Sequence, residues 1–167
     1  MNASDLQAQH RLLQSDPQRY VELLTEAIRA DDTDASSYFS RHFGWRHLNR
    51  SDLALADLAR AAALRPHPAV CLSRGTILSE LGRQKEALVA FAAGEALDPA
   101  AWQGTSGPLQ QANCHALLGD ERAALAACDG LPEDCWSPGL SGTPSGNRAE
   151  IIAALRRRAR AARATSG

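Results

Sequence analysis

The side chains that could do catalysis or bind a metal in this chain are histidines and cysteines, and the spacing of the histidines predicts no catalytic centre. The five histidines are His10, His42, His47, His67 and His115. His42 and His47 lie five residues apart, so they share a helix face poorly. The chain has no GxSxG, no HExxH and no glycine-rich phosphate loop ahead of a Lys-Ser/Thr pair. The sequence therefore predicts that the protein is not an enzyme.

The four cysteines form no CxxC pair. Cys114 and His115 could be combined with Cys128 and Cys135 into a zinc site, but that spacing matches no compact zinc finger. Free cysteine behaves as a small buried hydrophobic residue. We therefore expect free thiols, no metal and no cofactor.

Composition and charge indicate an ordinary globular chain. It has 167 residues, of which 44% are hydrophobic and 22% charged. Residues 1–134 carry 12 Lys/Arg and 18 Asp/Glu, a net charge of −6, whereas residues 135–167 carry a net charge of +5. An acidic body argues against nucleic-acid binding. The lack of a long apolar run argues against a membrane span, and the start of the sequence shows no signal peptide, so we expect a cytoplasmic location.

The elements that must position these side chains repeat with an offset of 33 residues. One segment reads Gly75-x6-Gly82-x4-Ala87-x3-Phe91-x2-Gly94-x4-Pro99, and the segment before it reads His42-x6-Asn49-x4-Ala54-x3-Leu58-x2-Ala61-x4-Pro66. Each half has helical apolar periodicity, and a short polar turn separates the halves. Proline ends the second helix of each unit because it cannot continue the hydrogen-bond ladder. Each unit is therefore predicted to be a helical hairpin.

This pattern resembles the tetratricopeptide repeat (TPR). The better copy carries Gly75, Gly82, Ala87, Phe91 and Pro99, and the other copy carries Tyr38, Ala54, Ala61 and Pro66. Gly94 replaces a usual alanine, and His42 and Asn49 replace two usual glycines. The resemblance implies an all-α fold, a short TPR-like solenoid of helical hairpins closed by a C-terminal capping helix.

The repeat frame divides the chain into segments. Residues 1–134 are predicted to form TPR-like hairpins, with the best copies at 35–67 and 68–101 and degenerate copies at 1–34 and 105–134. Residues 135–167 are predicted to form a Gly/Pro-rich loop without regular structure and an Arg-rich capping helix at about 148–163. Trp136 and Leu140 suggest that this loop packs on the body. Asp16 and Asn147 are predicted helix N-caps.

The resemblance also implies an inner surface lined by the first helix of each hairpin. The candidate partner-binding residues on it are Phe39, Phe43, Arg46, Leu72, Thr76, Gln110 and Asn113. Only Arg46 and Asn113 suit the carboxylate clamp by which some TPR proteins hold a C-terminal tail, and their placement does not reproduce it. The groove could instead hold an apolar helix or loop, or the phenylalanines could pack on the N-terminal hairpin.

Two tryptophans complete the candidate binding residues. Trp102 and Trp136 each lie in a Gly/Ser/Pro-rich loop, predicted to be at the same edge of the array. Tryptophan is enriched in binding hot spots. Alternatively, both rings cap the hydrophobic edge of the short third hairpin.

The arginines have two interpretations as well. Arg41 and Arg74 are equivalent in the repeat, and TPR-like pairs allow such an arginine to meet Asp57, so a structural ion pair is favoured over a ligand-binding arginine. The run Arg156-Arg157-Arg158, with Arg160 and Arg163, could contact an acidic partner, lipid or nucleic acid. The solvated face of a terminal helix is the favoured interpretation.

The resemblance implies a protein–protein interaction module whose partner is another protein, with no nucleic-acid or membrane partner. The chain looks like small stand-alone bacterial TPR proteins, some of which resemble immunity proteins that bind and block a secreted toxin. A general adaptor or chaperone with several clients is the alternative. An alternative of another class is a small enzyme or regulator that uses the edge formed by the Trp loops.

Overall fold

The computed structural model describes residues 3–165, and the side chains of residues 7–139 and 141–165. It forms two compact units, residues 1–70 and 71–167, and each is described by itself. Residues 1–2, which contribute to the expectation of no signal peptide, lie outside the described residues. The side chain of Leu140, which was expected to pack on the body, is also outside the described parts.

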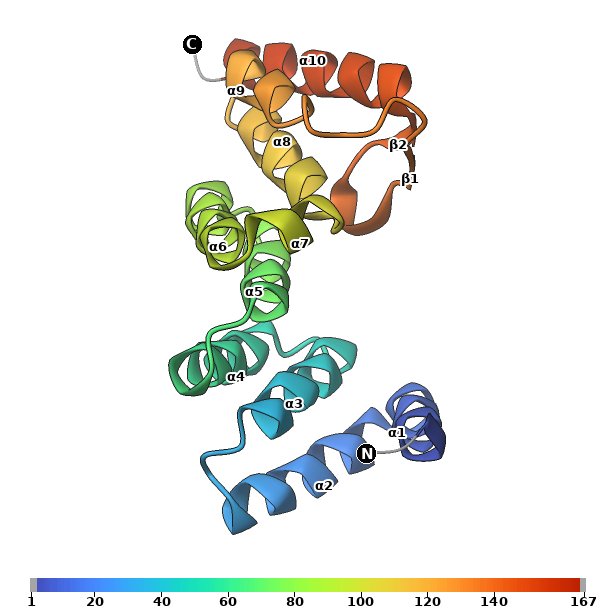
Figure 1. The fold of residues 1–167 in the computed structure, drawn as a ribbon, viewed down its shortest axis with the longest axis vertical. Coiled ribbons are helices and arrows are strands. Elements are labelled where there is room, and N and C mark those ends of the chain that lie inside the picture. Colours follow the sequence, from blue (N-terminus) through green and yellow to red (C-terminus); the bar gives the residue numbers. More distant parts are fainter. Residues whose placement is uncertain (1–2, 166–167) are drawn as a thin grey trace. The chain divides into compact units, whose positions relative to one another are not determined.

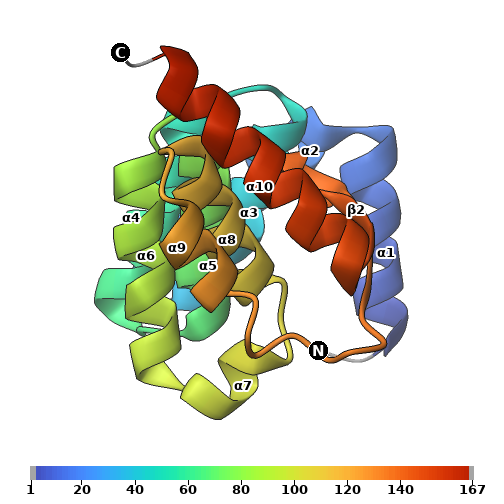
Figure 2. The ribbon, with the colours of Figure 1, turned by 90° about the horizontal axis from the view of Figure 1, so that it is seen from above.

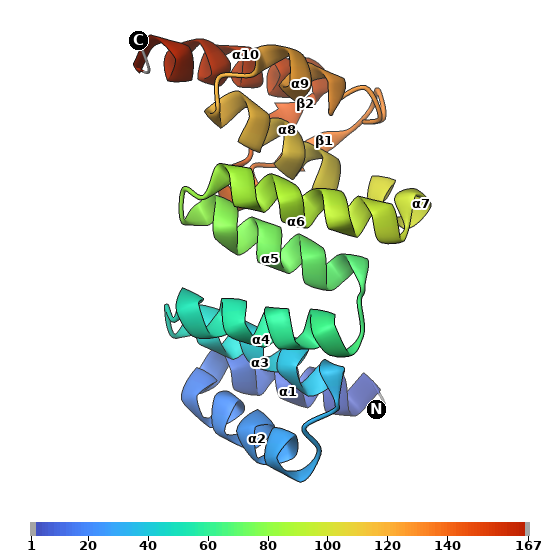
Figure 3. The same cartoon turned by 90° about the vertical axis from the view of Figure 1, so that its left-hand side faces the viewer.

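The first unit is made of antiparallel helices. They are α1 (Ala3–Ser15), α2 (Pro17–Ala30), α3 (Ala35–His47) and α4 (Ser51–Leu64). Asp16 caps α2 as predicted: its side chain accepts a hydrogen bond from the Arg19 backbone N–H at 2.9 Å. Figure 3 shows α3 and α4 side by side as one hairpin, with α2 on the other side of α3.

The second unit continues the hairpins and ends in a long helix. Helix α5 (Pro68–Glu80), whose first turn belongs to the first unit, is followed by α6 (Gln84–Leu97), α7 (Pro99–Gln103), α8 (Gly107–Leu117), α9 (Glu121–Ala126) and α10 (Arg148–Thr165). The residues inserted relative to the repeat form the short helix α7. Figure 2 shows α10 lying across α8 and α9. The helical solenoid fold predicted from the sequence is confirmed.

The turns inside the hairpins share one backbone conformation. Asn49, Gly82 and Gly119 have φ angles of 57°, 76° and 82°. Only glycine adopts positive φ without cost, and asparagine is among the residues that tolerate it best. Asn49 therefore replaces the glycine of the repeat without changing the turn.

The repeats pack through exchanges of large and small residues. A Cβ atom added to Gly75 would lie only 2.3 Å from the Phe91 ring, so this close approach requires glycine. In the preceding repeat, His42 is equivalent to Gly75 and Leu58 is equivalent to Phe91. Both His42 and Leu58 are fully buried. The larger residue on one helix is thus offset by a smaller one on the other.

The Gly/Pro-rich stretch is more regular than predicted. Strands β1 (Trp136–Pro138) and β2 (Ser145–Asn147) form an antiparallel pair, with Ser137 opposite Gly146. The prediction of no regular structure was therefore wrong for these residues. Gly139, Ser141 and Gly142 have the positive φ angles of the connection between the strands. Figure 1 shows the pair next to the N-terminal end of α10.

Helix α10 begins as predicted and completes the core of the second unit. Asn147 Oδ1 accepts from the Glu150 N–H at 3.1 Å, and Glu150 Oε2 accepts from the Asn147 N–H at 2.8 Å, which is a reciprocal capping box. Ile151, Leu155 and Ala159 are buried against Ala112, Ala116 and Ala124 of α8 and α9. The last hairpin, formed by α8 and α9, and the C-terminal helix α10 therefore share one core.

Candidate functional site

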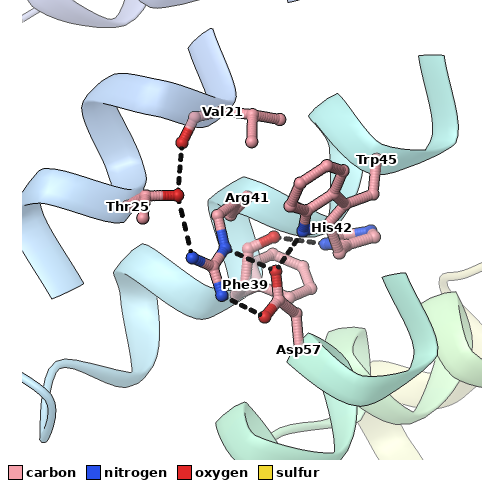
Figure 4. Close-up of polar contacts among 7 residues, drawn as sticks. All are labelled: Val21, Thr25, Phe39, Arg41, His42, Trp45 and Asp57. Atoms are coloured by element: carbon pink, nitrogen blue, oxygen red, sulfur yellow. Dashed lines mark hydrogen bonds and ion pairs between the residues drawn. The ribbon is translucent and has the colours of Figure 1, made fainter. Parts of the chain in front are cut away.

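A buried polar cluster ties α2, α3 and α4 together in the first unit. Asp57 accepts hydrogen bonds from Arg41 Nε at 2.9 Å, from Arg41 Nη2 at 2.7 Å and from Trp45 Nε1 at 3.0 Å (Figure 4). Arg41 Nη1 also donates to Thr25 Oγ1 at 2.9 Å, and Thr25 donates to the Val21 carbonyl. The structural ion pair favoured from the sequence is confirmed. Its counterpart Arg74 is exposed, and alanine stands at position 90, where the repeat places the carboxylate.

His42 is enclosed by aromatic rings beside this cluster. The Phe43 ring centroid lies 3.8 Å and the Phe39 centroid 4.9 Å from that of His42. The Nδ1 atom bonds to the Phe39 carbonyl, whereas Nε2 has no hydrogen-bond partner within the described residues. Burial lowers the pKa of His42 to about 4, with repulsion from Arg46 adding to the shift and the Phe39 carbonyl opposing it. His42 is thus a neutral packing residue at pH 7.

Acid should destabilise the first unit through His42. The unfolded state binds a proton near pH 6.5 and the folded state only near pH 4, so the free energy of unfolding falls as pH drops through this window. The expected loss between about pH 7.5 and about pH 5.0 is about 2 kcal/mol. Urea unfolding followed by far-ultraviolet circular dichroism measures it. The His42→Leu variant should lose this dependence, and a slope that persists in that variant would assign it to another group.

The candidate residues of the first unit share one face of α3. Phe39, Phe43 and Arg46 follow each other at spacings of four and three, which places them on the same side of the helix. Phe43 is 37% exposed, and Phe39 and Arg46 are partly exposed. Phe39 lines a cavity of about 150 Å³ with Val70. We call these three residues the α3 face.

The candidate residues of the second unit lie mostly inside it. Gln110 and Asn113 of α8 are buried, and the Asn113 side-chain oxygen accepts a hydrogen bond from Arg158 of α10. Thr76 is buried and donates to the Leu72 carbonyl at 2.9 Å, and Leu72 is partly buried. A partner would have to displace the C-terminal segment to reach Asn113. These four residues belong to the second unit, whereas the α3 face belongs to the first.

The two tryptophans have opposite environments. Trp102 has no exposed surface, and a Cβ atom on Gly94 or Gly107 would collide with its ring. Its Nε1 donates to Gln111 Oε1 at 3.2 Å. Trp136 on β1 is 69% exposed. Trp102 thus belongs to the core of the second unit, whereas Trp136 lies on its surface, so the two rings do not act as a pair.

One arginine of the C-terminal run, Arg158, differs from the solvated face that the sequence favoured, whereas Arg157 agrees with it. Arg158 is partly buried and donates to Asn113 and, at 2.6 Å, to the Gly142 carbonyl. Arg157 is exposed but lines an open hollow together with Trp136. No pattern in the sequence distinguishes these two from Arg156, Arg160 and Arg163, because the difference depends on where the hairpin packs.

The thiols and carboxylates show no arrangement for metal chemistry. Within the described residues, no group of three or more His, Cys, Asp or Glu side chains could hold a metal ion. All four cysteines are free, and burial raises the pKa of Cys128 to about 11, so its thiol is protonated at neutral pH. None of the described helices is both long enough and apolar enough to span a membrane.

The comparisons with known proteins agree with the repeat pattern and the fold. No family model matches the chain. Human tetratricopeptide repeat protein 28 is 34% identical over 84 residues, which is 50% of this chain, and the chain spans only 3% of that protein's length. Among solved structures, MamA matches with a TM-score of 0.68 at 13% identity, covering 99% of this chain and 97% of MamA. The MamA RS-1 ArsTM double mutant also matches with a TM-score of 0.68, at 16% identity, covering 96% of this chain and 93% of that one.

Proposed function

Starting from a chain that is a TPR-type helical solenoid, we propose that it is a protein–protein interaction module that binds its partner through the α3 face. The observation that carries this proposal is that Phe39, Phe43 and Arg46 are partly exposed on one face of α3. Other residues of α3 bind the neighbouring helix α4. Aromatic residues and arginine dominate binding hot spots. The buried bonds from Arg41 and Trp45 to Asp57 fix α3 against α4, so little conformational freedom is lost on binding.

The finer proposal is that the partner is single and dedicated, as in an immunity protein that blocks a secreted bacterial toxin. A rigid face with large side chains supports one complementary surface better than many clients, because promiscuous surfaces rely on flexible, adaptable side chains. We propose no catalytic role, since the buried His42 is neutral and enclosed. A general adaptor with several clients is the competing function.

Capture from a lysate of the native cells tests this proposal. The tagged wild-type chain should retain one protein at a stoichiometric ratio, identified and quantified by mass spectrometry. The Phe43→Ala variant should lose at least about tenfold in affinity, because a hot-spot aromatic contributes more than about 1.4 kcal/mol. Val89→Ala is the matched control, because Val89 is an apolar side chain on α6 that is 71% exposed.

The outcomes separate the candidate functions. One partner lost by Phe43→Ala and kept by Val89→Ala supports the dedicated module, and rescue of cell growth from that partner's toxicity would establish inhibition. Many substoichiometric partners would indicate an adaptor. If both variants lose the same affinity for the partner while their circular dichroism is unchanged, the α3 face is not the binding site.

A further inference from the structure

An open hollow lies between the β-hairpin and α10 in the second unit. Its volume is about 620 Å³, and its walls include Trp136, Pro144 and Gly146 from the hairpin and Glu150, Arg157 and Arg158 from the helix. We call it the Trp136 hollow. It is built from one continuous segment of the chain, residues 136–158, and the strand pairing and the capping box hold its two walls together.

Trp136 gives the hollow an apolar wall. Its side chain is 69% exposed, although tryptophan is one of the largest apolar side chains and is usually well buried. Asn147 lies opposite Trp136 in the strand pair. Pro138, two residues after Trp136 on the same strand, is exposed as well. This wall offers an extended segment an aromatic face and a proline ring.

The other wall carries two arginines, Arg157 and Arg158, and one glutamate, Glu150. Arg157 is exposed, and neither Arg157 nor Arg158 has an ion pair within the described residues. Arg158 donates to two neutral oxygens, those of Asn113 and Gly142. The carboxylate of Glu150 already accepts the Asn147 N–H in the capping box. The hollow therefore has a net charge of +1 beside an apolar surface.

We propose that the Trp136 hollow binds an extended acidic segment of a protein partner, in which an apolar side chain neighbours an Asp or Glu. The apolar side chain packs on the Trp136 indole, and the carboxylate pairs with Arg157, whose planar guanidinium can hold both oxygens. This inference deepens the proposed function, since it adds a second contact region and states the chemistry of the segment that it binds.

The charges around the hollow favour a carboxylate over a polyanion. Glu150 lines the same hollow and repels a phosphate-rich ligand. Residues 1–134 carry a net charge of −6, which opposes the approach of nucleic acid or an anionic membrane. A peptide with one carboxylate matches the net charge of +1 of the hollow, and Glu150 repels it less than a phosphate-rich ligand because it carries fewer negative charges.

Titration with short blocked peptides tests the inference without knowing the partner. The probe is acetyl-Gly-Leu-Asp-Gly-amide, and its neutral match is acetyl-Gly-Leu-Asn-Gly-amide. Nuclear magnetic resonance follows the Trp136 indole N–H and the Arg157 amide of the full chain. The acidic peptide should shift both signals with a Kd of about 1 mM or below, as expected for a few contacts.

Matched variants localise the binding. Arg157→Gln and Trp136→Ala should each weaken binding about tenfold, through the lost charge-assisted bonds and the lost apolar contact. Arg122→Gln removes the same charge from an exposed residue of α9 outside the hollow and should change the Kd less than twofold. Phe43→Ala should leave peptide binding unchanged, so a failure of the α3 face and a failure of this inference give different results.

Three outcomes would overturn the inference. Equal shifts with the neutral peptide would remove the charge argument. Equal weakening by Arg122→Gln would mean that net charge alone attracts the peptide. Saturation of the same signals by heparin or phosphatidylserine vesicles, with no response to the acidic peptide, would assign the hollow to a polyanion.

Discussion

The Trp102→Ala variant should lose about 3–5 kcal/mol of unfolding free energy, the amount typical of truncating a fully buried aromatic side chain. Trp102 has no exposed surface and fills the space that Gly94 and Gly107 leave open. Its removal leaves a cavity between α6, α7 and α8 and also removes the hydrogen bond to Gln111. Urea unfolding followed by far-ultraviolet circular dichroism measures the loss.

Two further variants make this result specific. Trp136→Ala should change stability by less than about 0.5 kcal/mol, because that ring is mostly exposed. Trp102→Phe keeps most of the buried volume and should lose less than Trp102→Ala. A Trp102→Ala variant as stable as the wild type, but unable to bind the partner, would restore Trp102 as a contact residue.

The Asp57→Ala variant should destabilise the first unit by about 3–5 kcal/mol, because it leaves a buried cation without its partner. Asp57 is the acceptor for Arg41 and for Trp45, and both partners are largely shielded from solvent. Arg41 would keep its hydrogen bond to Thr25 and its contacts with the Tyr38 and Trp45 rings, none of which carries a negative charge. Urea unfolding followed by far-ultraviolet circular dichroism measures the loss.

The neighbouring Asp52 provides a matched control on the same helix. Asp52 pairs with Arg50 at 3.2 Å, but both side chains are more than half exposed, so Asp52→Ala should leave stability nearly unchanged. The double variant Arg41→Met with Asp57→Leu should recover much of the loss, because the unpaired charge is gone. Equal effects of Asp52→Ala and Asp57→Ala would contradict the structural role of the buried cluster.

The parts of the fold that depend on local pattern were predictable from the sequence. Helical periodicity and the 33-residue offset predict the hairpins at the positions where α3 to α6 lie. Asp16 and Asn147 cap their helices. Capping is predictable because it needs only a side-chain oxygen that accepts a hydrogen bond from a backbone N–H a few residues later. The pair of Arg41 and Asp57 was predictable because the repeat fixes which turns of two adjacent helices meet.

The candidate site was less predictable, because exposure depends on contacts distant in sequence. The repeat frame treats Asn113 as equivalent to residues of an open groove, but Arg158, 45 residues later, reaches its side chain. The same frame groups Trp102 with Trp136, although one is in the core and the other on the surface. A spacing pattern contains no information on which later segment covers a position.

The sequence by itself therefore determined the helical hairpins, their caps and the buried ion pair, since periodicity, capping and repeat register act over short separations. Only the tertiary structure decided which candidate residues stay accessible. The docking of α10 on α8 and α9 buried Asn113, and the strand pairing of residues 136–147 formed the hollow beside Trp136. Helix α10 docks there because the last repeat must cover its apolar face, and this contact joins residues far apart in the sequence.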